Sequence, residues 1–304
     1  MIVDRLIEAI EDRENPTALG LDTRLEYLPE RFAAQFDTSN LVGASGAILA
    51  YNKALVDGLK EIVPCVKVQA AYYEMYGMPG LAAMEETVRY AKENGLYVIL
   101  DVKRNDIGAT SEAYANAYLG ETALKDRAVR TFSADFATIN PYLGVDGVAP
   151  FLKACEAYDR GIFLLVKTSN PSSSQLQDMR LEDGRTVFEA VADLVNQWGA
   201  DSRGSYGYSR AGAVVGATHP EQGAVLRRRM PHTFFLLPGY GAQGAKGKDL
   251  VGMFDENKRG AVVNASRSLL CAWKKWQAED FVTAAREEAY KMKEDIMDAL
   301  SASR

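Results

Sequence analysis

The sequence contains little cysteine and histidine, the residues on which many structural and metal sites depend. Its three cysteines, Cys65, Cys155 and Cys271, are odd in number and widely spaced, and they form no Cys-x-x-Cys pair. This pattern is typical of reduced thiols in the cytoplasm and argues against a disulfide framework or a zinc site. The two histidines, His219 and His232, lie apart in the chain, so a histidine-rich metal site is not expected.

Long apolar runs and an excess of positive charge are also missing. No apolar stretch approaches the ~20 residues that a membrane-spanning helix requires. Residues 1–16 have the pattern of an acidic amphipathic helix, which differs from that of a signal peptide. The formal net charge of −6 argues against nucleic acid as the main partner. A small anionic substrate would therefore need its own local cationic pocket.

Apolar β-type runs alternate with helical segments along the chain. The predicted strands are 17–21, 64–69, 97–100, 134–141, 161–167, 211–218, 233–238 and 260–264. The predicted helices include 2–13, 29–60, 79–94, 146–158, 184–198, 220–230, 249–257 and 278–300. Because no linker divides this pattern, it predicts one domain over residues 1–304, a parallel (β/α)8 TIM barrel with an extra N-terminal helix. The alternative, a doubly wound open sheet, would normally carry a GxGxxG after its first strand, and none is present there.

The stretch 96–110, LYVILDVKRNDIGAT, joins a strand to a dense group of charges. Its apolar run is continuous, as in strands that are buried on both faces. Residues two apart in a strand point to one side, so Asp101 and Lys103 should project together, with Asp106 in the following loop. A structural ion pair at the barrel rim is one interpretation. Burying such charges is costly, however, and apolar substitutes would usually serve stability better, so the cluster favours chemistry.

Further polar residues lie at or beyond the carboxyl ends of other predicted strands, and in a barrel these ends meet on one face. They are Asp22, Ser169, Gln243 and Arg267, whereas Lys67 lies within its strand. The loop PGYGAQG (238–244) is rich in glycine, which lets backbone N–H groups approach an anion. Arg267 follows the eighth strand and can bind phosphate in a bidentate way. A tight turn would also explain the glycines, but loops seven and eight form the common phosphate site of such barrels.

Together these motifs resemble those of orotidine 5′-phosphate decarboxylase, in its longer bacterial subgroup. The matching segments are Leu21-Asp22, Lys67, LDVKRNDIGAT (100–110), INPYLG (139–144), VKTSNPSS (166–173), LLPGYGAQG (236–244) and VNASR (263–267). They span nearly the whole chain in the family's order. The Asp-x-Lys-x-x-Asp core alone is less specific, since sugar-phosphate decarboxylases of the same superfamily share it. Asn105 is a small departure, because the subgroup is expected to have glycine there.

The resemblance implies decarboxylation of orotidine 5′-phosphate to UMP and CO2, the last step of de novo pyrimidine biosynthesis, without metal or cofactor. Lys103 would deliver a proton to C6 of the pyrimidine within a charge network of Lys67, Asp101, Lys103 and Asp106. No motif offers a cofactor as an electron sink, so a fixed ammonium would have to stabilise the carbanion at C6. The family is dimeric, and Asp106 and Thr110 would serve the active site of the neighbouring subunit.

The resemblance also implies roles in substrate binding. Asp22, with the first lysine of the network, would contact the ribose hydroxyls. Ser169 would contact the pyrimidine ring, with Pro238 against the base, and Gln243 and Arg267 would bind the phosphate. The protein is expected to be a cytoplasmic homodimer that binds neither nucleic acid nor membranes.

Three other interpretations remain open from the sequence. A metal-dependent sugar-phosphate decarboxylase or aldolase would need a magnesium site made of carboxylates. A Schiff-base aldolase would use Lys103 or Lys167, although carboxylates around Lys103 disfavour a neutral amine. A catalytically silent phosphate-binding barrel would not need the charged cluster. The polar segment 172–181 is either a closing loop over the substrate or an ordinary exposed loop.

Overall fold

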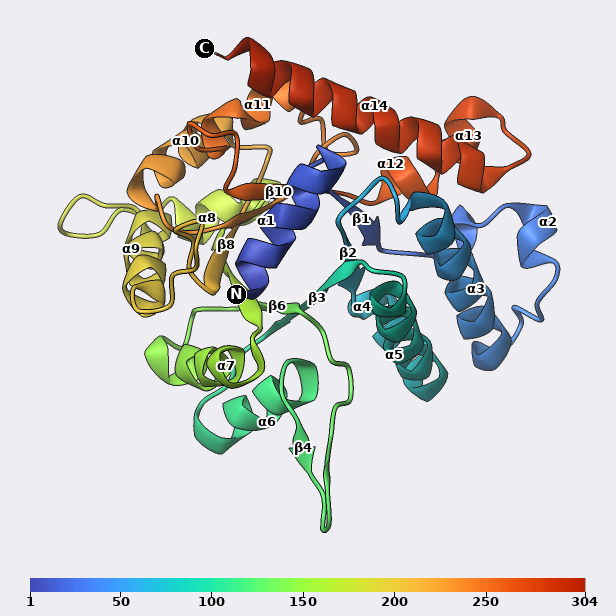
Figure 1. The fold of residues 1–304 in the computed structure, drawn as a ribbon, viewed down its shortest axis with the longest axis horizontal. Coiled ribbons are helices and arrows are strands. Elements are labelled where there is room, and N and C mark those ends of the chain that lie inside the picture. Colours follow the sequence, from blue (N-terminus) through green and yellow to red (C-terminus); the bar gives the residue numbers. More distant parts are fainter. Residues whose placement is uncertain (304) are drawn as a thin grey trace.

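A computed structural model describes residues 1–303. Eight parallel strands close into a barrel in the order β1-β10-β9-β8-β7-β6-β3-β2 (Figure 1). These strands are β1 (Thr17–Leu21), β2 (Cys65–Gln69), β3 (Tyr97–Arg104), β6 (Phe136–Ile139), β7 (Gly161–Lys167), β8 (Ala211–Val215), β9 (Phe235–Pro238) and β10 (Ala261–Ala265). They are apolar and largely buried because side chains fill the interior and helices cover the outside. The predicted (β/α)8 TIM barrel is confirmed.

The longer helices surround the barrel and pack their apolar faces against it (Figure 1). They are α3 (Leu41–Leu59), α5 (Gly77–Glu93), α6 (Gly108–Tyr118), α7 (Val145–Tyr158), α9 (Val187–Gly199), α10 (Pro220–Arg229) and α14 (Phe281–Ala302). Short helices lie in the connections: α2 (Glu30–Ala33), α4 (Ala71–Glu74), α8 (Ser174–Gln177), α11 (Gly247–Leu250), α12 (Arg267–Leu270) and α13 (Ala272–Trp276). In the part of the chain that the structure describes, none of the helices has the length and apolar character needed to cross a membrane.

The extra N-terminal helix, α1 (Ile2–Arg13), crosses the amino-terminal end of the barrel (Figure 1). Its apolar face is fully buried against the first residues of the strands, among them Ile99, Phe136 and Phe163. A helix with one apolar stripe must bury that stripe against another element, and here it covers the floor of the barrel. The carboxyl ends of the strands lie at the opposite end of the barrel, which α1 leaves uncovered.

The structure differs from the predicted pattern at one helix and in one additional sheet. The predicted helix 29–60 is broken between α2 and α3, because Asn40 ends the connection and caps α3 by accepting a 2.9 Å hydrogen bond from the N–H of Gly43. A two-stranded antiparallel sheet of β4 (Thr122–Ala123) and β5 (Ala128–Val129) was not predicted. Figure 1 shows this hairpin extending away from the barrel. Strands this short have no periodic apolar pattern from which they could be recognised.

Candidate active site

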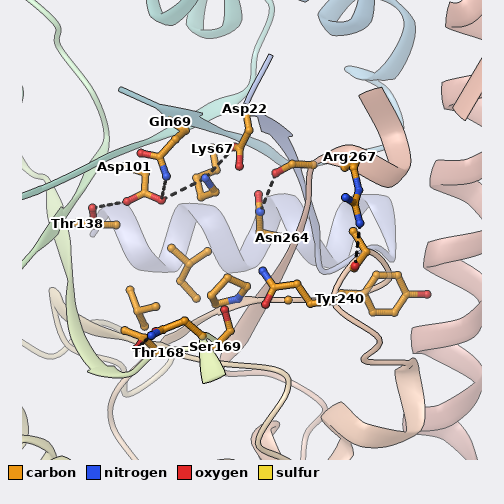
Figure 2. Close-up of a pocket in the computed structure, with 18 of the residues that line it drawn as sticks. Asp22, Lys67, Gln69, Asp101, Thr138, Thr168, Ser169, Tyr240, Asn264 and Arg267 are labelled. Atoms are coloured by element: carbon orange, nitrogen blue, oxygen red, sulfur yellow. Dashed lines mark hydrogen bonds and ion pairs between the residues drawn. The ribbon is translucent and has the colours of Figure 1, made fainter. Parts of the chain in front are cut away.

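A cavity of about 560 Å³ opens at the carboxyl end of the barrel. Strand ends and the loops that follow them supply its walls, as the fold requires. The lining includes these predicted site residues: Asp22, Lys67, Asp101, Lys103, Ser169, Pro238, Gln243 and Arg267. In Figure 2, Asp101 lies at one end of the cavity and Arg267 at the other. The structure therefore brings together residues that are separated by up to 245 positions in the sequence (267 − 22).

Acidic and basic side chains alternate along one wall of the cavity. Lys67 Nζ lies 3.1 Å from Asp22 Oδ1 and 3.2 Å from Asp101 Oδ2. The other oxygen of Asp101 lies 2.6 Å from Lys103 Nζ. The result is a continuous row of Asp22, Lys67, Asp101 and Lys103, each paired with the next. Such a row fixes the position of Lys103 Nζ at the edge of the cavity.

Asp101 is the central group of this row. Besides the two lysines, Gln69 Nε2 donates to its carboxylate at 3.0 Å and Thr138 Oγ1 donates at 2.8 Å (Figure 2). Burial alone would raise the pKa of Asp101, but the charges of Lys67 and Lys103 and the hydrogen bonds from Lys103 and Thr138 outweigh it and hold the pKa below its usual range. The group is therefore a fixed anion at neutral pH.

Lys67 is almost completely buried in β2. Its pairing with Asp22 and Asp101 explains how this mainly apolar strand can carry a lysine. Burial would lower the pKa of Lys67, but the charges of Asp22 and Asp101 more than compensate and raise the pKa above its ordinary value. Lys67 is therefore a permanent cation between two carboxylates. This state differs from that of a lysine whose amine is made neutral for nucleophilic attack.

The position of Lys103 depends on an irregularity in β3. The register against β6 shifts between Leu100 and Arg104, and Lys103 has a φ of 47°, in the left-handed region. Its backbone N–H donates to Thr138 Oγ1 at 2.9 Å. Lys103 and Asp101 do meet as expected, but regular strand alternation is not the reason. A bulge turns the lysine toward the cavity, and such irregularities are common beside active sites.

The far end of the cavity is made of the glycine-rich loop and Arg267. Gly239, Gly241 and Gly244 have φ values of 108°, 67° and 99°, which other residues rarely adopt. Arg267 Nη2 donates to the carbonyl of Ala242 in this loop at 3.1 Å. Gln243 and Arg267 are both exposed, so their polar groups can reach a ligand. This combination of donors suits an anion.

Two predicted residues lie outside the cavity. Within residues 1–303, the lining includes neither Asp106 nor Thr110. Asp106 Oδ1 instead accepts a hydrogen bond of 2.8 Å from the N–H of Ile107 in its own loop. Thr110 is exposed in the first turn of α6. One chain therefore unites only Lys67, Asp101 and Lys103 of the predicted four-residue network.

Comparison with known proteins agrees with the resemblance seen in the motifs. Residues 37–286 match the sequence model of the Orotidine 5′-phosphate decarboxylase / HUMPS family. The chain belongs to this family. It is 42% identical over 301 residues to an orotidine 5′-phosphate decarboxylase of Caldicellulosiruptor saccharolyticus, covering 98% of both chains. It is also 42% identical over 275 residues to one of Rhodopirellula baltica, covering 90% of this chain and 89% of the relative. The solved structure of the Leishmania donovani OMP decarboxylase matches with a TM-score of 0.73 and 30% identity over 98% of this chain and 99% of that one.

Several other residues that line the cavity were not predicted from the sequence. They are Tyr27, Gln69, Tyr72, Thr138 and Asn264, with Leu165, Val214 and Leu236 from strands β7, β8 and β9 and a few loop residues. Two of them carried a signal, since Gln69 lies two residues after Lys67 on the same face of β2 and Asn264 belongs to the VNASR motif. Thr138 is a single hydroxyl within an apolar strand, and the two tyrosines come from short helices in the connections, Tyr27 from a 3-10 turn (Leu25–Tyr27) and Tyr72 from α4. Their positions follow only from the tertiary structure.

Lys167, the other lysine weighed for Schiff-base chemistry, points away from the cavity. It is fully buried, and its Nζ lies 2.7 Å from Asp178 Oδ1. Next to it, Gln177 accepts a hydrogen bond from the N–H of Thr168 at 3.0 Å and donates to Thr168 Oγ1 at 2.8 Å. These contacts attach the segment 172–181, which contains α8, to the end of β7. In this state, 172–181 contributes nothing to the cavity lining among the described residues.

Among the described residues, the carboxylates of the cavity are not arranged as metal ligands. Across residues 1–303, no group of three or more His, Cys, Asp and Glu side chains is arranged to hold a metal ion. The carboxylates in the cavity, Asp22 and Asp101, are each paired with a lysine ammonium. Their charges are therefore already compensated by protein cations.

Proposed function

We propose that this protein decarboxylates orotidine 5′-phosphate to UMP and CO2, the last step of de novo pyrimidine biosynthesis. The observation that carries the proposal is the row Asp22–Lys67–Asp101–Lys103 on one wall of a cavity. The far end of that cavity has the glycine-rich loop and Arg267, a set of donors that suits an anion. The cavity volume of about 560 Å³ suits a nucleotide. Membership of the family, with relatives of that name over nearly the whole chain, supports the same substrate.

Lys103 is the proposed proton donor. The bond between C6 and the carboxyl carbon breaks, CO2 leaves, and the electron pair remains on C6. The ammonium of Lys103, held 2.6 Å from Asp101, stabilises this developing anion and then gives its proton to C6, forming the new C–H bond. The neutral amine regains a proton from solvent. Because the ammonium is already in place, little reorganisation is needed in the transition state.

The remaining cavity residues are proposed to bind the parts of the substrate that do not react. Asp22 and Lys67 bind the ribose hydroxyls, Ser169 and Pro238 contact the base, and Gln243 and Arg267 bind the phosphate. The order of these groups along the cavity supports this assignment, since Lys67 lies beside Asp22 and Asp101 while Arg267 lies at the other end in Figure 2. Binding energy from the remote phosphate can then be used to hold the base against Lys103. Neither a cofactor nor a metal takes part in the proposed reaction.

The enzyme is proposed to act as a homodimer in which Asp106 and Thr110 complete the site of the partner. Exposed apolar residues around them support this arrangement. Ile107 is 56% exposed, Met78 is 76% exposed and Tyr142 is 80% exposed. They follow β3, β2 and β6, which are neighbours in the barrel, so they lie at one sector of its rim. Exposed apolar groups concentrated on one surface are typical of protein interfaces.

The proposed location of the protein is the cytoplasm, where cysteine thiols are kept reduced. Cys65 and Cys155 are free and buried, and Cys271 is free and partly buried. Burial raises the pKa of Cys65 and Cys155, so these thiols stay protonated and unreactive. The acidic overall charge gives no support for a nucleic-acid partner.

The test is an ultraviolet assay of the purified protein with orotidine 5′-phosphate, with and without EDTA. We expect conversion to UMP that persists in EDTA and is lost in Lys103→Ala. Turnover that EDTA abolishes would instead favour a metal-dependent member of the superfamily. Binding without turnover by folded wild-type protein would favour a silent phosphate-binding barrel.

Sharing of sites between subunits has its own test. Asp106→Ala and Arg267→Ala variants are each expected to be weakly active, because each damages every site of its homodimer. Mixed dimers contain one site with neither change, so mixing should restore part of the activity. Absence of recovery, when mass spectrometry of tagged subunits demonstrates exchange, would contradict the shared site.

A further inference from the structure

A single carboxylate holds both ends of the segment 240–247, which continues the glycine-rich loop to the start of α11 and is called the loop below. Asp295 lies on α14, about fifty residues after the loop in the sequence, yet its Oδ2 accepts two hydrogen bonds from it. Tyr240 Oη donates at 2.8 Å from the start of the loop, and the N–H of Gly247 donates at 2.7 Å from its end. Figure 1 shows α14 passing beside α11, which begins at Gly247. One side chain therefore sets the distance between the two ends.

The close approach of α14 depends on glycine at position 247. A Cβ atom there would collide with the backbone carbonyl of Asp295. Gly241 to Gly244 are exposed, and the loop is closed by hydrogen bonds of 2.9 Å from Gly241 N to the Ala245 carbonyl and from Gly244 N to the Gly241 carbonyl. A short exposed segment with several glycines loses much conformational freedom when it is ordered. An anchor at its two ends removes part of that freedom before the ligand arrives.

Tyr240 connects this anchor to the cavity. Tyr240 is one of the residues that line the cavity and lies next to Arg267 in Figure 2. Burial, and then the hydrogen bond to the Asp295 carboxylate, raises the pKa of the Tyr240 hydroxyl. The phenol therefore remains a neutral donor over the physiological pH range. Asp295 can thus act on the phosphate end of the cavity although it does not line it.

We infer that Asp295 is a positioning residue for phosphate binding, which acts through Tyr240 and Gly247 to hold the loop that carries Gln243. This inference rests on the proposed function, since it assigns the loop to the phosphate of the substrate. Without the carboxylate, the loop must be ordered by the substrate itself, at a cost to affinity. The loss should be confined to substrates that carry the phosphate.

The experiment compares Asp295→Ala with wild type on two substrates, orotidine 5′-phosphate and the nucleoside orotidine, which lacks the phosphate. For the phosphorylated substrate we expect KM to rise about tenfold, because the two charge-assisted hydrogen bonds that order the loop are lost, with little change in kcat. The kcat/KM for orotidine should stay at the wild-type value. Asp295→Asn, which keeps an acceptor oxygen, should recover part of the loss, and Tyr240→Phe should fall between wild type and Asp295→Ala.

Asp298→Ala is the matched control. Asp298 is an exposed aspartate one turn further along α14, and within residues 1–303 the structure records no hydrogen bond to its side chain. This variant should resemble wild type on both substrates. Equal losses on the two substrates in Asp295→Ala would assign Asp295 a general structural role and overturn the inference. An unchanged KM for orotidine 5′-phosphate would overturn it as well.

Calorimetric titration separates this inference from the proposed function. If the wild-type protein fails to decarboxylate orotidine 5′-phosphate, the proposed function fails. The positioning role is then judged from the affinities for UMP and for uridine. A rise in the Kd of UMP in Asp295→Ala of about tenfold, with the Kd of uridine unchanged, supports it. No difference between the two ligands contradicts it.

Discussion

Replacing Asp101 with alanine should destabilise the folded protein as well as abolish decarboxylation. The carboxylate accepts hydrogen bonds from Lys67, Gln69, Lys103 and Thr138. Its removal leaves Lys67, whose side chain is only 4% exposed, with one carboxylate instead of two. Removing one partner of a buried pair costs about 3–5 kcal/mol. Because Asp22 still lies 3.1 Å from Lys67, we expect the lower end of this range, about 3 kcal/mol.

This loss of free energy can be converted into a melting temperature. The unfolding entropy is about 2.1 cal/mol/K per residue, or roughly 0.6 kcal/mol/K for this chain of 304 residues. A loss of about 3 kcal/mol therefore lowers Tm by about 5 °C. Calorimetry at pH 7 measures it. Asp126→Ala is the control, because Asp126 is exposed in the hairpin connecting β4 to β5 and should leave Tm unchanged within about 1 °C.

The stabilisation that the Asp101 carboxylate provides should also decrease as the pH falls. In the folded protein the pKa of Asp101 lies below its ordinary value of 3.8. A carboxyl group with a lowered folded pKa stabilises the protein above its unfolded pKa, and this contribution is lost as the pH falls through the folded pKa. The Tm difference between wild type and Asp101→Ala should be complete at pH 7 and shrink below about pH 4. A difference below about 1 °C at pH 7, or one that is constant down to pH 3, would refute the reasoning.

Three further changes test other parts of the structure. Lys103→Met should abolish turnover but change the free energy of unfolding by less than about 1 kcal/mol, because the Lys103 side chain is 45% exposed; urea denaturation measures this. Asp178→Ala should lower the free energy of unfolding by about 3 kcal/mol, because it leaves the fully buried Lys167 unpaired. In the same assay, the double variant Lys167→Met/Asp178→Leu should recover most of this loss. A double variant as unstable as Asp178→Ala would contradict this account. Gly20→Ala should cost about 1–3 kcal/mol in thermal denaturation, because its Cβ would collide with Ser266 Oγ, and an unchanged Tm would show that β1 and β10 can separate without cost.

The motif 100–110 illustrates how far local patterns reach. The apolar run before Asp101 predicted a buried strand, and the charges after it predicted the site, both of which follow from the chemistry of neighbouring residues. The path of β3 through Lys103 did not follow, because its bulge depends on pairing with β6 and on the hydroxyl of Thr138. Thr138 lies thirty-five residues further along the chain. A non-local partner of this kind leaves no trace in the local sequence.

The glycine-rich loop shows the same division. Its composition indicated a turn able to approach an anion, and its place before Arg267 indicated phosphate. That Asp295 on α14 holds both ends of the loop was not predictable, since an aspartate on the exposed face of a helix is usually only solvated. The packing of α14 against α11 decided which aspartate of that helix meets the loop.

The sequence by itself determined the alternation of strands and helices, and therefore the barrel, because hydrophobic periodicity and turn residues act over a few positions. It also determined which residues could carry chemistry, since charged side chains are costly in buried strands. Only the tertiary structure decided which of these residues meet. The closed sheet brings Asp22, Lys67 and Asp101 from three strands into one row of ion pairs, while Asp106 is directed away from it. Contacts between distant segments depend on how whole elements pack, and no local pattern records that geometry.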